Sequence, residues 1–420
     1  MRLVLISMDA ASRLDAEKLL RLPNLSKMAE NGVLCTNVST VYPTLTYPIH
    51  ASIISGCYPD RHGIAHNELF DENPPQYRPW YWEADRIKVP TLFTAANAAG
   101  RDSAALLWPT TGKAKFIGYN MPEILAFPWE NQVLKVLKYG STWELIKSEL
   151  KYGKQRKSNK QPHLDSFVTL LATKLIERQY SRQIEKQAEV SYSSRQRRKH
   201  MPDFMAIHLV ELDAMRHEFG VDSTESESAL RHLDYNIGLI LQSLSMRDLL
   251  RDTLVCVVSD HGHENVYESV NLNAILKHYS VPARAQSLGF GAYFHTERAD
   301  RTLVYNHLVQ HMDEYKIAHV YSNQELRSLR APENIQIACE MQEGVEALDT
   351  DKSPKHKATH GFSLKSPSAK TLFWLMGPNI KRGVELDSMD IVDIAPTLAY
   401  ASGLSLTGTD GKLLNNIFID

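Results

Sequence analysis

Six acidic and imidazole side chains in this 420-residue sequence follow runs of apolar residues, and their types could ligate metal ions. An acid after a strand is commonly a turn residue or a helix cap, so each of them alone is a weak signal. Together, three carboxylates and three imidazoles offer enough ligands for two divalent cations. These candidates are Asp9 in ISMD, Asp213 and His217 in ELDAMRH, Asp260 and His261 in SDHGH, and His360 in ATHGF.

The spacing of these residues favours two neighbouring cations. Four positions separate Asp213 from His217, which puts both side chains on one face if the segment forms a helix. The adjacent Asp260 and His261 can point in opposite directions from a strand end, one toward each cation. Nearby histidines are interpreted as packing or hydrogen-bonding residues, since these are more common than ligands: His50, His62, His66 and His263.

Thr46 is a candidate reactant for such a site. It precedes Tyr47-Pro48 and the helix-like stretch IHASIIS, so its hydroxyl is expected at a helix N-terminus. The amide dipoles there favour an anion, and a metal-bound hydroxyl ionises more readily. Local sequence alone favours the simpler alternative, in which Thr46 only caps this helix. Thr44 is a rival nucleophile two residues upstream.

Short, continuously apolar segments are expected to position these residues. The runs LVLISMD, SAALLWP, FMAIHLVELD, TLVCVVSDHG and TLFWLMGP are typical of strands buried on both faces of a mainly parallel sheet. Helical periodicity between them, as in SALRHLDYNIGLILQSL, predicts a doubly wound α/β fold. Ligands of such folds bind at the carboxyl ends of strands, where Asp9, Asp213 and Asp260 lie.

Two regions interrupt this pattern. Residues 121–199 have helical periodicity and many basic residues, which predicts a helical basic insertion that could cap the site, mediate dimerisation or approach a membrane surface. Residues 281–354 mix short strands with a helix pattern, which predicts a small α+β insertion. The catalytic core would then comprise residues 1–120, 200–280 and 355–420. The basic cluster of the first insertion is interpreted as a solvated face: Arg195, Arg197, Arg198 and Lys199.

Composition limits the classes of function. Lys plus Arg number 47 against 49 Asp plus Glu, a net charge of -2, which disfavours a nucleic acid polymer as partner. The four cysteines include no CxxC pair and are interpreted as buried thiols in a reducing compartment. The start MRLVLISMDA lacks a signal-peptide pattern, and no apolar window approaches the roughly 20 residues of a transmembrane segment. We therefore expect a cytoplasmic protein, of unknown oligomeric state.

The order of the motifs resembles the nucleotide pyrophosphatase/phosphodiesterase (type I phosphodiesterase) family of the alkaline phosphatase superfamily. The sequence has ISMD, PTLTYPIH, SGCYPDRHGIAHN, DAMRH, SDHG and THGF in that family's order. The resemblance reaches from Asp9 to the closing DGKLLNNIF and skips the two insertions. It implies an alkaline-phosphatase-like fold, with a mainly parallel central sheet flanked by helices.

The resemblance also implies roles for individual residues. Thr46 is the nucleophile, Asn67 donates to a non-bridging phosphoryl oxygen, and Tyr47 stacks on a nucleobase or leaving-group ring. Ile49 departs from the family's usual Asn at this position. Two divalent metal ions, with zinc as the expected metal, are implied to be held by Asp9, Thr46, Asp260 and His261 and by Asp213, His217 and His360.

The implied activity is hydrolysis of a phosphodiester or pyrophosphate bond through a covalent phospho-threonine intermediate, with a small-molecule phosphodiester or nucleotide as substrate. Three alternatives stay open: a phosphonoacetate-type phosphonate hydrolase, a phosphomonoesterase and a non-catalytic binding protein. Thr46 counts against the monoesterase, since those relatives mostly use Ser. The presence of all seven candidate ligands counts against the binding protein.

Overall fold

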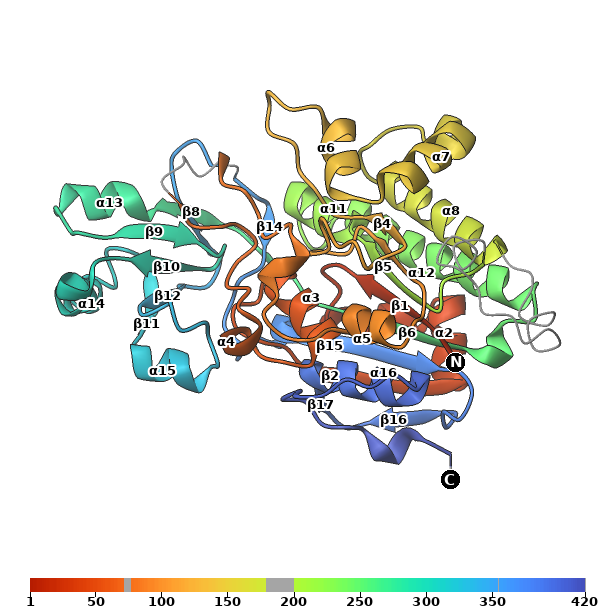
Figure 1. Ribbon diagram of the computed structural model, residues 1–420. Coiled ribbons are helices and arrows are strands. Elements are labelled where there is room, and N and C mark those ends of the chain that lie inside the picture. Colours follow the sequence, from red (N-terminus) through yellow and green to blue (C-terminus); the bar gives the residue numbers. More distant parts are fainter. Residues whose placement is uncertain (72–76, 179–199, 354, 420) are drawn as a thin grey trace.

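The computed structural model of the protein describes residues 1–71, 77–178, 200–353 and 355–419. Within these residues a nine-stranded sheet forms the centre of the molecule, with helices on both sides (Figure 1). The strands follow one another across the sheet as β16 (Val384–Leu386), β2 (Gly32–Ser39), β15 (Lys370–Met376), β6 (Thr253–Ser259), β1 (Arg2–Met8), β5 (Phe204–Leu209), β3 (Ser103–Leu106) and β4 (Tyr119–Met121), and β17 (Met389–Asp390) also pairs with β2.

The sheet is mainly parallel, as predicted. Only β15 is reversed, since it runs antiparallel to both β6 and β2 while the other pairs are parallel. Every residue of β1, β5 and β6 is buried. Alternate side chains enter different hydrophobic clusters, Val4 and Ile6 on one face and Leu3 and Leu5 on the other. The continuous apolar runs therefore mark strands that are covered on both faces.

Helices on the two faces complete these clusters. One face is covered by α1 (Ala16–Leu20), α2 (Pro23–Glu30), α8 (His163–Glu177), α11 (Glu211–Phe219) and α12 (Thr224–Ser245). The opposite face is covered by α3 (Thr46–Ser55), α5 (Leu92–Ala98) and α16 (Ile394–Ser402). The expected alternation of strands and helices is thus confirmed.

The segment that follows β4 divides its helices between the surface and the core. Helices α6 (Gln132–Tyr139) and α7 (Thr142–Tyr152) contact the edge strand β4 and stand out from the body of the molecule (Figure 1). Helix α8 instead packs on α12 and shares the hydrophobic cluster of the central sheet. Part of the region expected as an insertion therefore belongs to the main core. The basic cluster of residues 195–199 lies outside the described residues.

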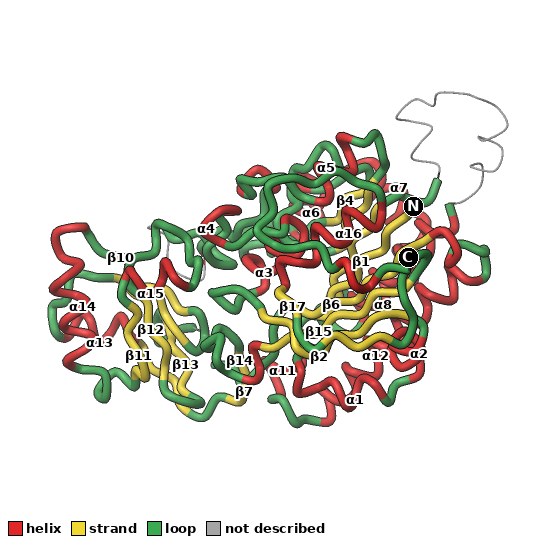
Figure 2. The backbone as a smooth tube through the Cα atoms, turned by 90° about the horizontal axis from the view of Figure 1, so that it is seen from below, coloured by secondary structure: helices red, strands yellow, loops and turns green. Residues whose placement is uncertain are grey.

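A smaller lobe with its own hydrophobic cluster stands beside the central sheet (Figure 2). Its four antiparallel strands are ordered β11 (Ile317–Tyr321), β12 (Ala338–Met341), β10 (Gly291–His295) and β9 (Arg284–Ser287). Around them lie α13 (Leu272–His278), α14 (Arg301–Gln310), α15 (Asn323–Ser328) and the parallel pair β8 (Glu268–Asn271) and β13 (Val345–Leu348). Between lobe and core, β7 (Glu264–Asn265) pairs with β14 (Ala358–Thr359), and α4 (Pro59–His62) follows α3.

None of the helices in the described part of the chain is both long and apolar enough to span a membrane.

Candidate active site

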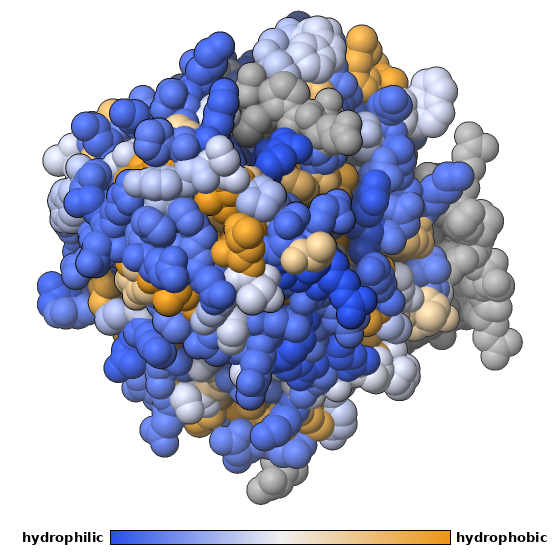
Figure 3. Space-filling view, turned by 90° about the vertical axis from the view of Figure 1, so that its left-hand side faces the viewer, coloured by the Kyte–Doolittle hydropathy of each residue, from blue (hydrophilic) through white to orange (hydrophobic). Residues whose placement is uncertain are grey.

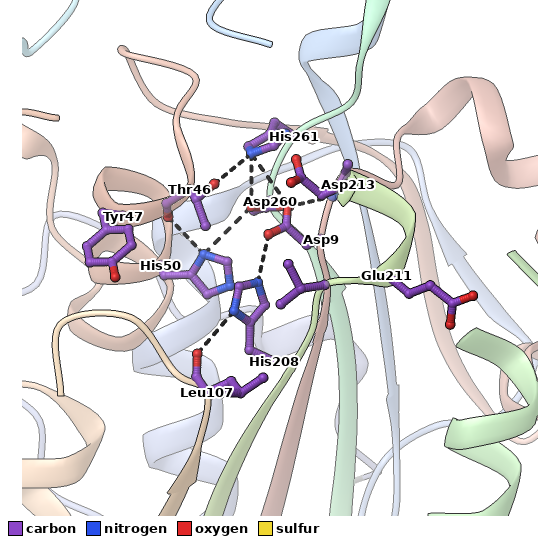
Figure 4. A network of polar contacts seen from close by, with 12 residues as sticks. Asp9, Thr46, Tyr47, His50, Leu107, His208, Glu211, Asp213, Asp260 and His261 are labelled. Carbon is purple, nitrogen blue, oxygen red and sulfur yellow. Dashed lines mark hydrogen bonds and ion pairs between the residues drawn. The ribbon is translucent and has the colours of Figure 1, made fainter. Parts of the chain in front are cut away.

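The carboxyl ends of β1 and β6 bring Asp9, Asp260 and His261 together, with one potential ligand atom of each within 4.8 Å of the others (Figure 4). Nε2 of His261 lies 3.6 Å from Asp9 Oδ1 and 3.2 Å from Asp260 Oδ2. All three side chains are buried. Asp9 Oδ1 and Asp260 Oδ2 have no hydrogen-bond partner among the described residues, so each carboxyl directs an unused oxygen into the site.

The electrostatics of this first group fit a bound cation. Burial, and then the charges of Asp260 and Asp213, raise the pKa of Asp9 well above its usual range. Ionised carboxylates crowded in a buried site cost free energy unless a positive charge offsets them. The unused oxygens supply hard donors and His261 a borderline one, a mixture that suits zinc. The residues present therefore fit a divalent metal ion.

His208, on β5, supports this group and was missed by the sequence analysis. Its Nε2 lies 2.9 Å from Asp9 Oδ2, and its Nδ1 lies 3.1 Å from the carbonyl oxygen of Leu107. Burial lowers the pKa of His208 to about 4, so the ring is neutral. Nδ1–H donates to the carbonyl oxygen of Leu107 while Nε2 contacts Asp9, so His208 fixes the orientation of that carboxyl. The only sequence feature that could have indicated His208 is its position inside the apolar run FMAIHLVELD.

A second group lies beside the first and contains Asp213, His217, His360 and, in addition, His263. Asp213 Oδ1 lies 2.9 Å from His263 Nε2 and 3.4 Å from His217 Nε2. Burial, and then neighbouring histidines, lower the pKa of His360 well below its usual range, which keeps this ring in the neutral form that binds metals. Four side chains with mixed N and O donors thus fit a second divalent cation.

His263 was expected to serve in packing or hydrogen bonding, and its Nε2 does form a hydrogen bond of 2.9 Å with Asp213; its ring also offers a nitrogen that lies close enough to the other ligand candidates to join them. Alternate residues of an extended segment point the same way, and His261 and His263 are two positions apart. Their rings are stacked at 5.9 Å between centroids. This two-residue period is the sequence signal that could have assigned His263 to the site.

Helix α11 confirms the predicted common face of Asp213 and His217, and buried polar contacts hold it in place. Asp165 of α8 accepts hydrogen bonds from the backbone N–H groups of Val210 and Glu211, at 2.8 and 2.9 Å, at the N-terminus of α11. An ion pair of 2.6 Å joins Arg216 to Asp15, just beyond β1. Residues outside the motifs therefore fix the position of α11 relative to Asp9.

The turn after β14 places His360 against α11. His217 Nδ1 donates to the carbonyl oxygen of Ala358 at 2.9 Å, which leaves His217 Nε2 directed at Asp213. Gly361 has a φ of +82°, and a Cβ at this position would lie 1.6 Å from the carbonyl oxygen of Leu288. Only glycine allows the backbone to pass so close to Leu288, so the HG pair of THGF fixes the turn that carries His360.

Thr46 begins α3, as predicted, and its Oγ1 lies 3.1 Å from His261 Nε2 (Figure 4). His50, one turn later, donates from Nδ1 to the carbonyl oxygen of Thr46 at 2.8 Å. The hydroxyl of the rival Thr44 donates to the carbonyl oxygen of Phe362 at 2.9 Å. Of the two threonines, Thr46 is the one whose hydroxyl contacts the first group.

Asn67 and Tyr47 are joined through the backbone. Asn67 Oδ1 accepts from the Tyr47 N–H at 2.9 Å, so the amide nitrogen of Asn67 remains available as a donor. The Tyr47 ring has no exposed surface, and its hydroxyl donates to the carbonyl oxygen of Glu123 at 3.3 Å. It packs against Trp80 and the buried Ile124. This packing leaves no open face on Tyr47, which speaks against its predicted stacking on a ligand ring.

Glu123 is a further acid of the site that the sequence analysis missed, because no motif contains it. It follows β4, whose carboxyl end lies at the same edge of the sheet as Asp9. Its Oε2 is buried without a hydrogen-bond partner among the described residues. Burial, and then the charge of Asp213, raise the pKa of Glu123 to about 8 from an ordinary 4.5. The charge of Asp213 reaches Glu123, so this carboxyl belongs to the electrostatics of the site.

The raised pKa of Glu123 predicts a pH-dependent stability of the metal-free protein. A carboxyl with a higher pKa in the folded state loses stability as pH rises from its unfolded to its folded pKa, here from about 4.5 to about 8. The variant Glu123→Gln should therefore unfold at a higher temperature than the wild type, by a margin that grows across this range. Thermal unfolding in a chelator tests this, with the exposed Glu218→Gln as control. Equal margins at all pH values would contradict it.

Two adjacent groups of acids and histidines at the carboxyl edge of a mainly parallel α/β sheet are typical of metal-dependent hydrolases. Residues 3–363 match the family model described as type I phosphodiesterase/nucleotide pyrophosphatase. The chain belongs to this family.

Comparison with individual relatives agrees with this assignment. The human bis(5'-adenosyl)-triphosphatase ENPP4 is 23% identical over 428 residues, which cover 96% of this chain and 78% of that protein. Human ectonucleotide pyrophosphatase/phosphodiesterase family member 1 is 23% identical over 93% of this chain but only 39% of its own length. Murine ectonucleotide pyrophosphatase/phosphodiesterase 5 superposes with a TM-score of 0.71 and 18% identity over the whole of both chains. An inactive form of that protein in complex with AMP also has a TM-score of 0.71, with 16% identity. These structures confirm the alkaline-phosphatase-like fold.

Proposed function

We propose that the protein hydrolyses phosphodiester or pyrophosphate bonds in small molecules such as nucleotides, through a covalent phospho-threonine intermediate on Thr46. The observation that carries this proposal is the position of the Thr46 hydroxyl, 3.1 Å from His261 Nε2 at the first turn of α3. The diadenosine triphosphatase name of one relative and the AMP complex of another support nucleotides as a substrate class.

Two divalent cations, with zinc favoured by the mixed donors, belong to the proposal. When bound, they would supply the positive charge that ionises the threonine hydroxyl and stabilises the oxygens of the phosphoryl group. Asp9, Thr46, Asp260 and His261 would hold one of them, and Asp213, His217, His263 and His360 the other.

The chain's own residues would carry two successive displacements at phosphorus. The Thr46 oxygen forms a bond to phosphorus while the bond to the leaving oxygen breaks. Water then attacks the phospho-threonine, the bond from phosphorus to Thr46 breaks, and a monophosphate is released. The N-terminal dipole of α3 favours negative charge on the Thr46 oxygen in both steps. His50 restrains the Thr46 backbone through its hydrogen bond to the carbonyl oxygen.

Asn67 would donate from its amide nitrogen to a non-bridging phosphoryl oxygen, because its Oδ1 is held by the Tyr47 N–H. A fixed donor to developing charge contributes about 3 kcal/mol, so Asn67→Ala should lower kcat about 100-fold. Steady-state kinetics and metal analysis of the same preparations test this, and the metal content should not change. An Asn67→Ala enzyme with wild-type kcat would remove this role.

A panel of p-nitrophenyl substrates tests the proposed function on the zinc-loaded protein. We expect thymidine 5'-monophosphate p-nitrophenyl ester to be cleaved with a higher kcat/KM than p-nitrophenyl phosphate. A faster monoester would favour a phosphomonoesterase, and preferential release of phosphate from phosphonoacetate would favour the phosphonate hydrolase. Absence of all turnover, with fewer than about one divalent ion bound per chain, would favour a non-catalytic protein.

A further inference from the structure

The segment after β4 exposes an unusual number of apolar side chains. Among the described residues, sixteen large apolar side chains are exposed, and six of these lie between positions 125 and 150. Monomeric proteins seldom concentrate apolar surface in this way unless the surface contacts something. The six are Leu125, Trp129, Val133, Leu134, Trp143 and Leu150, and we refer to residues 125–154 as the α6–α7 crest.

Buried contacts and hydrogen bonds join the crest to the rest of the protein. Its exposed apolar side chains therefore do not result from poor packing of this segment. Leu145 of α7 is buried in the main hydrophobic cluster, and Ser148 accepts a hydrogen bond of 3.0 Å from the Tyr119 hydroxyl. The side chain of Gln132, the first residue of α6, forms hydrogen bonds with the backbone of Ile124 and Ala126 at 2.6 and 2.8 Å. One side of the crest therefore packs on the rest of the protein and the other side is exposed, and α6 and α7 lie at the periphery of the molecule (Figure 1).

The outward face of α7 combines large apolar and basic side chains. Trp143 and Leu150 are 75% and 82% exposed and lie seven residues apart, on the same side of the helix. Lys147 and Lys151 are exposed between and beside them, and Lys154 follows one turn later. Long lysine side chains can extend past an apolar face and keep their charge in a polar layer.

The charge of the crest differs from that of the chain as a whole. Crest residues 125–154 contain five basic and three acidic residues, and three more basic residues follow by position 160, whereas the net charge of the whole chain is -2. The three acids already pair with three of the bases, Glu130 with Lys135, Glu144 with Lys147 and Glu149 with Arg156. A surplus of positive charge thus surrounds the exposed tryptophan and leucine side chains.

We propose that the α6–α7 crest docks on the surface of a bilayer that contains anionic phospholipids. Tryptophan and leucine would enter the boundary between head groups and acyl chains, and the lysines would contact lipid phosphates. A second copy of the chain would bring two positive faces together, which like charge disfavours. A polyanion such as RNA would use the charges but would leave the exposed leucines and valine in water. The membrane surface is the partner that matches both features.

The smaller lobe, which lies away from the crest, has a different surface (Figures 1 and 3). The face over the lobe that carries α13 and α14 is mostly hydrophilic, with its apolar side chains in small groups (Figure 3). The crest leaves the core at the carboxyl end of β4, the edge that also carries Asp9 and Asp260. Docking through the crest would hold that edge of the sheet near the bilayer, but the proposal does not depend on the proposed hydrolysis.

Vesicle binding of the full chain tests the proposal, with the Thr46→Ala variant used so that turnover plays no part. Flotation should recover the protein with phosphatidylcholine vesicles that contain about 30% phosphatidylserine, at least about tenfold more tightly than with phosphatidylcholine alone. Binding should weaken as salt is added. Tryptophan emission should shift to shorter wavelength, and brominated lipids should quench it.

Paired variants separate the crest from other exposed surface. Trp143→Ser with Leu150→Ser, and Lys151→Glu with Lys154→Glu, should each lower binding at least about tenfold. The controls, Leu303→Ser with Tyr400→Ser and Lys277→Glu with Arg298→Glu, change other exposed residues outside the crest and should bind as the parent does. Circular dichroism verifies that each variant is folded.

Three outcomes would overturn the proposal. One is the absence of binding to anionic vesicles, and another is binding that the crest variants do not reduce. The third is a crest-dependent dimer or RNA complex without vesicle binding, measured by sedimentation. A protein that binds vesicles but hydrolyses nothing would support the docking and contradict only the proposed function, so the two failures can be distinguished.

Discussion

Thr46→Ala should abolish turnover, with kcat expected to fall by at least about 10⁴-fold, because the side chain that forms the covalent bond to phosphorus is removed. The hydroxyl lies at the edge of the first group of ligand candidates, and Asp9, Asp260 and His261 remain in place without it. Metal content should therefore stay near two ions per chain. Diester hydrolysis and elemental analysis of the same sample measure the two quantities.

Thr44→Ala is the matched control for this experiment. Its hydroxyl donates to the backbone of Phe362, so its removal costs about 1 kcal/mol of stability and should leave kcat within about tenfold of the wild type. Mass spectrometry of acid-quenched wild-type enzyme should detect a phosphorylated peptide that contains Thr46. Normal turnover by Thr46→Ala, or loss of turnover in Thr44→Ala with Thr46 intact, would exclude Thr46 as the nucleophile.

Much of the fold could be predicted from the sequence because apolar periodicity is a local property. The runs that became β1, β3, β5, β6 and β15 were all identified, and their uninterrupted apolar character follows from burial on both faces. The reversed direction of β15 was not predicted, since strand direction depends on the connections and leaves no trace in hydrophobicity. The short strands β4 and β17 carry too few residues for any period to show.

The residues of the candidate site also fall into those that the sequence could predict and those that it could not. Residues in motifs could be found, because their order and spacing are visible in the chain, and the structure brings Asp9, Asp213, Asp260 and His360 into two adjacent groups. The residues that support the site could not be found in this way, because they contact partners that are distant in the sequence. Asp165, for example, holds a helix N-terminus 45 residues away.

Tyr47 and Glu123 illustrate what spacing cannot determine. A motif position identifies Tyr47 as an aromatic residue beside the nucleophile, but its exposure depends on which other segment covers it. Residues 123 and 124 provide that cover, with a hydrogen bond from the Tyr47 hydroxyl and an apolar contact from Ile124. The same segment buries the Glu123 carboxyl near Asp213. A region assigned to an insertion therefore shapes the centre of the site.

Removal of divalent cations should eliminate turnover and also lower stability. Without a cation, the unused oxygens of Asp9 and Asp260 remain buried with only like charges and neutral rings around them. A cation that binds the folded state alone stabilises it, by about 3 kcal/mol at a free concentration 100 times its dissociation constant. Dialysis against a chelator should therefore lower the thermal midpoint as activity falls to background, and zinc should restore both.

Substitution of single ligand candidates makes this test specific to the two groups. Asp260→Asn keeps the size of the side chain but removes its charge, so the first group should bind zinc more weakly and the midpoint should respond less to added zinc. Asp248→Asn, at an exposed position outside both groups, is the matched control and should behave as the wild type does. If the metal-depleted protein retained full turnover, or if zinc raised the midpoints of wild type and Asp260→Asn equally, the proposed cation site at Asp9, Asp260 and His261 would be wrong, because the Asp260 carboxylate would then contribute nothing to the binding of zinc by the folded chain.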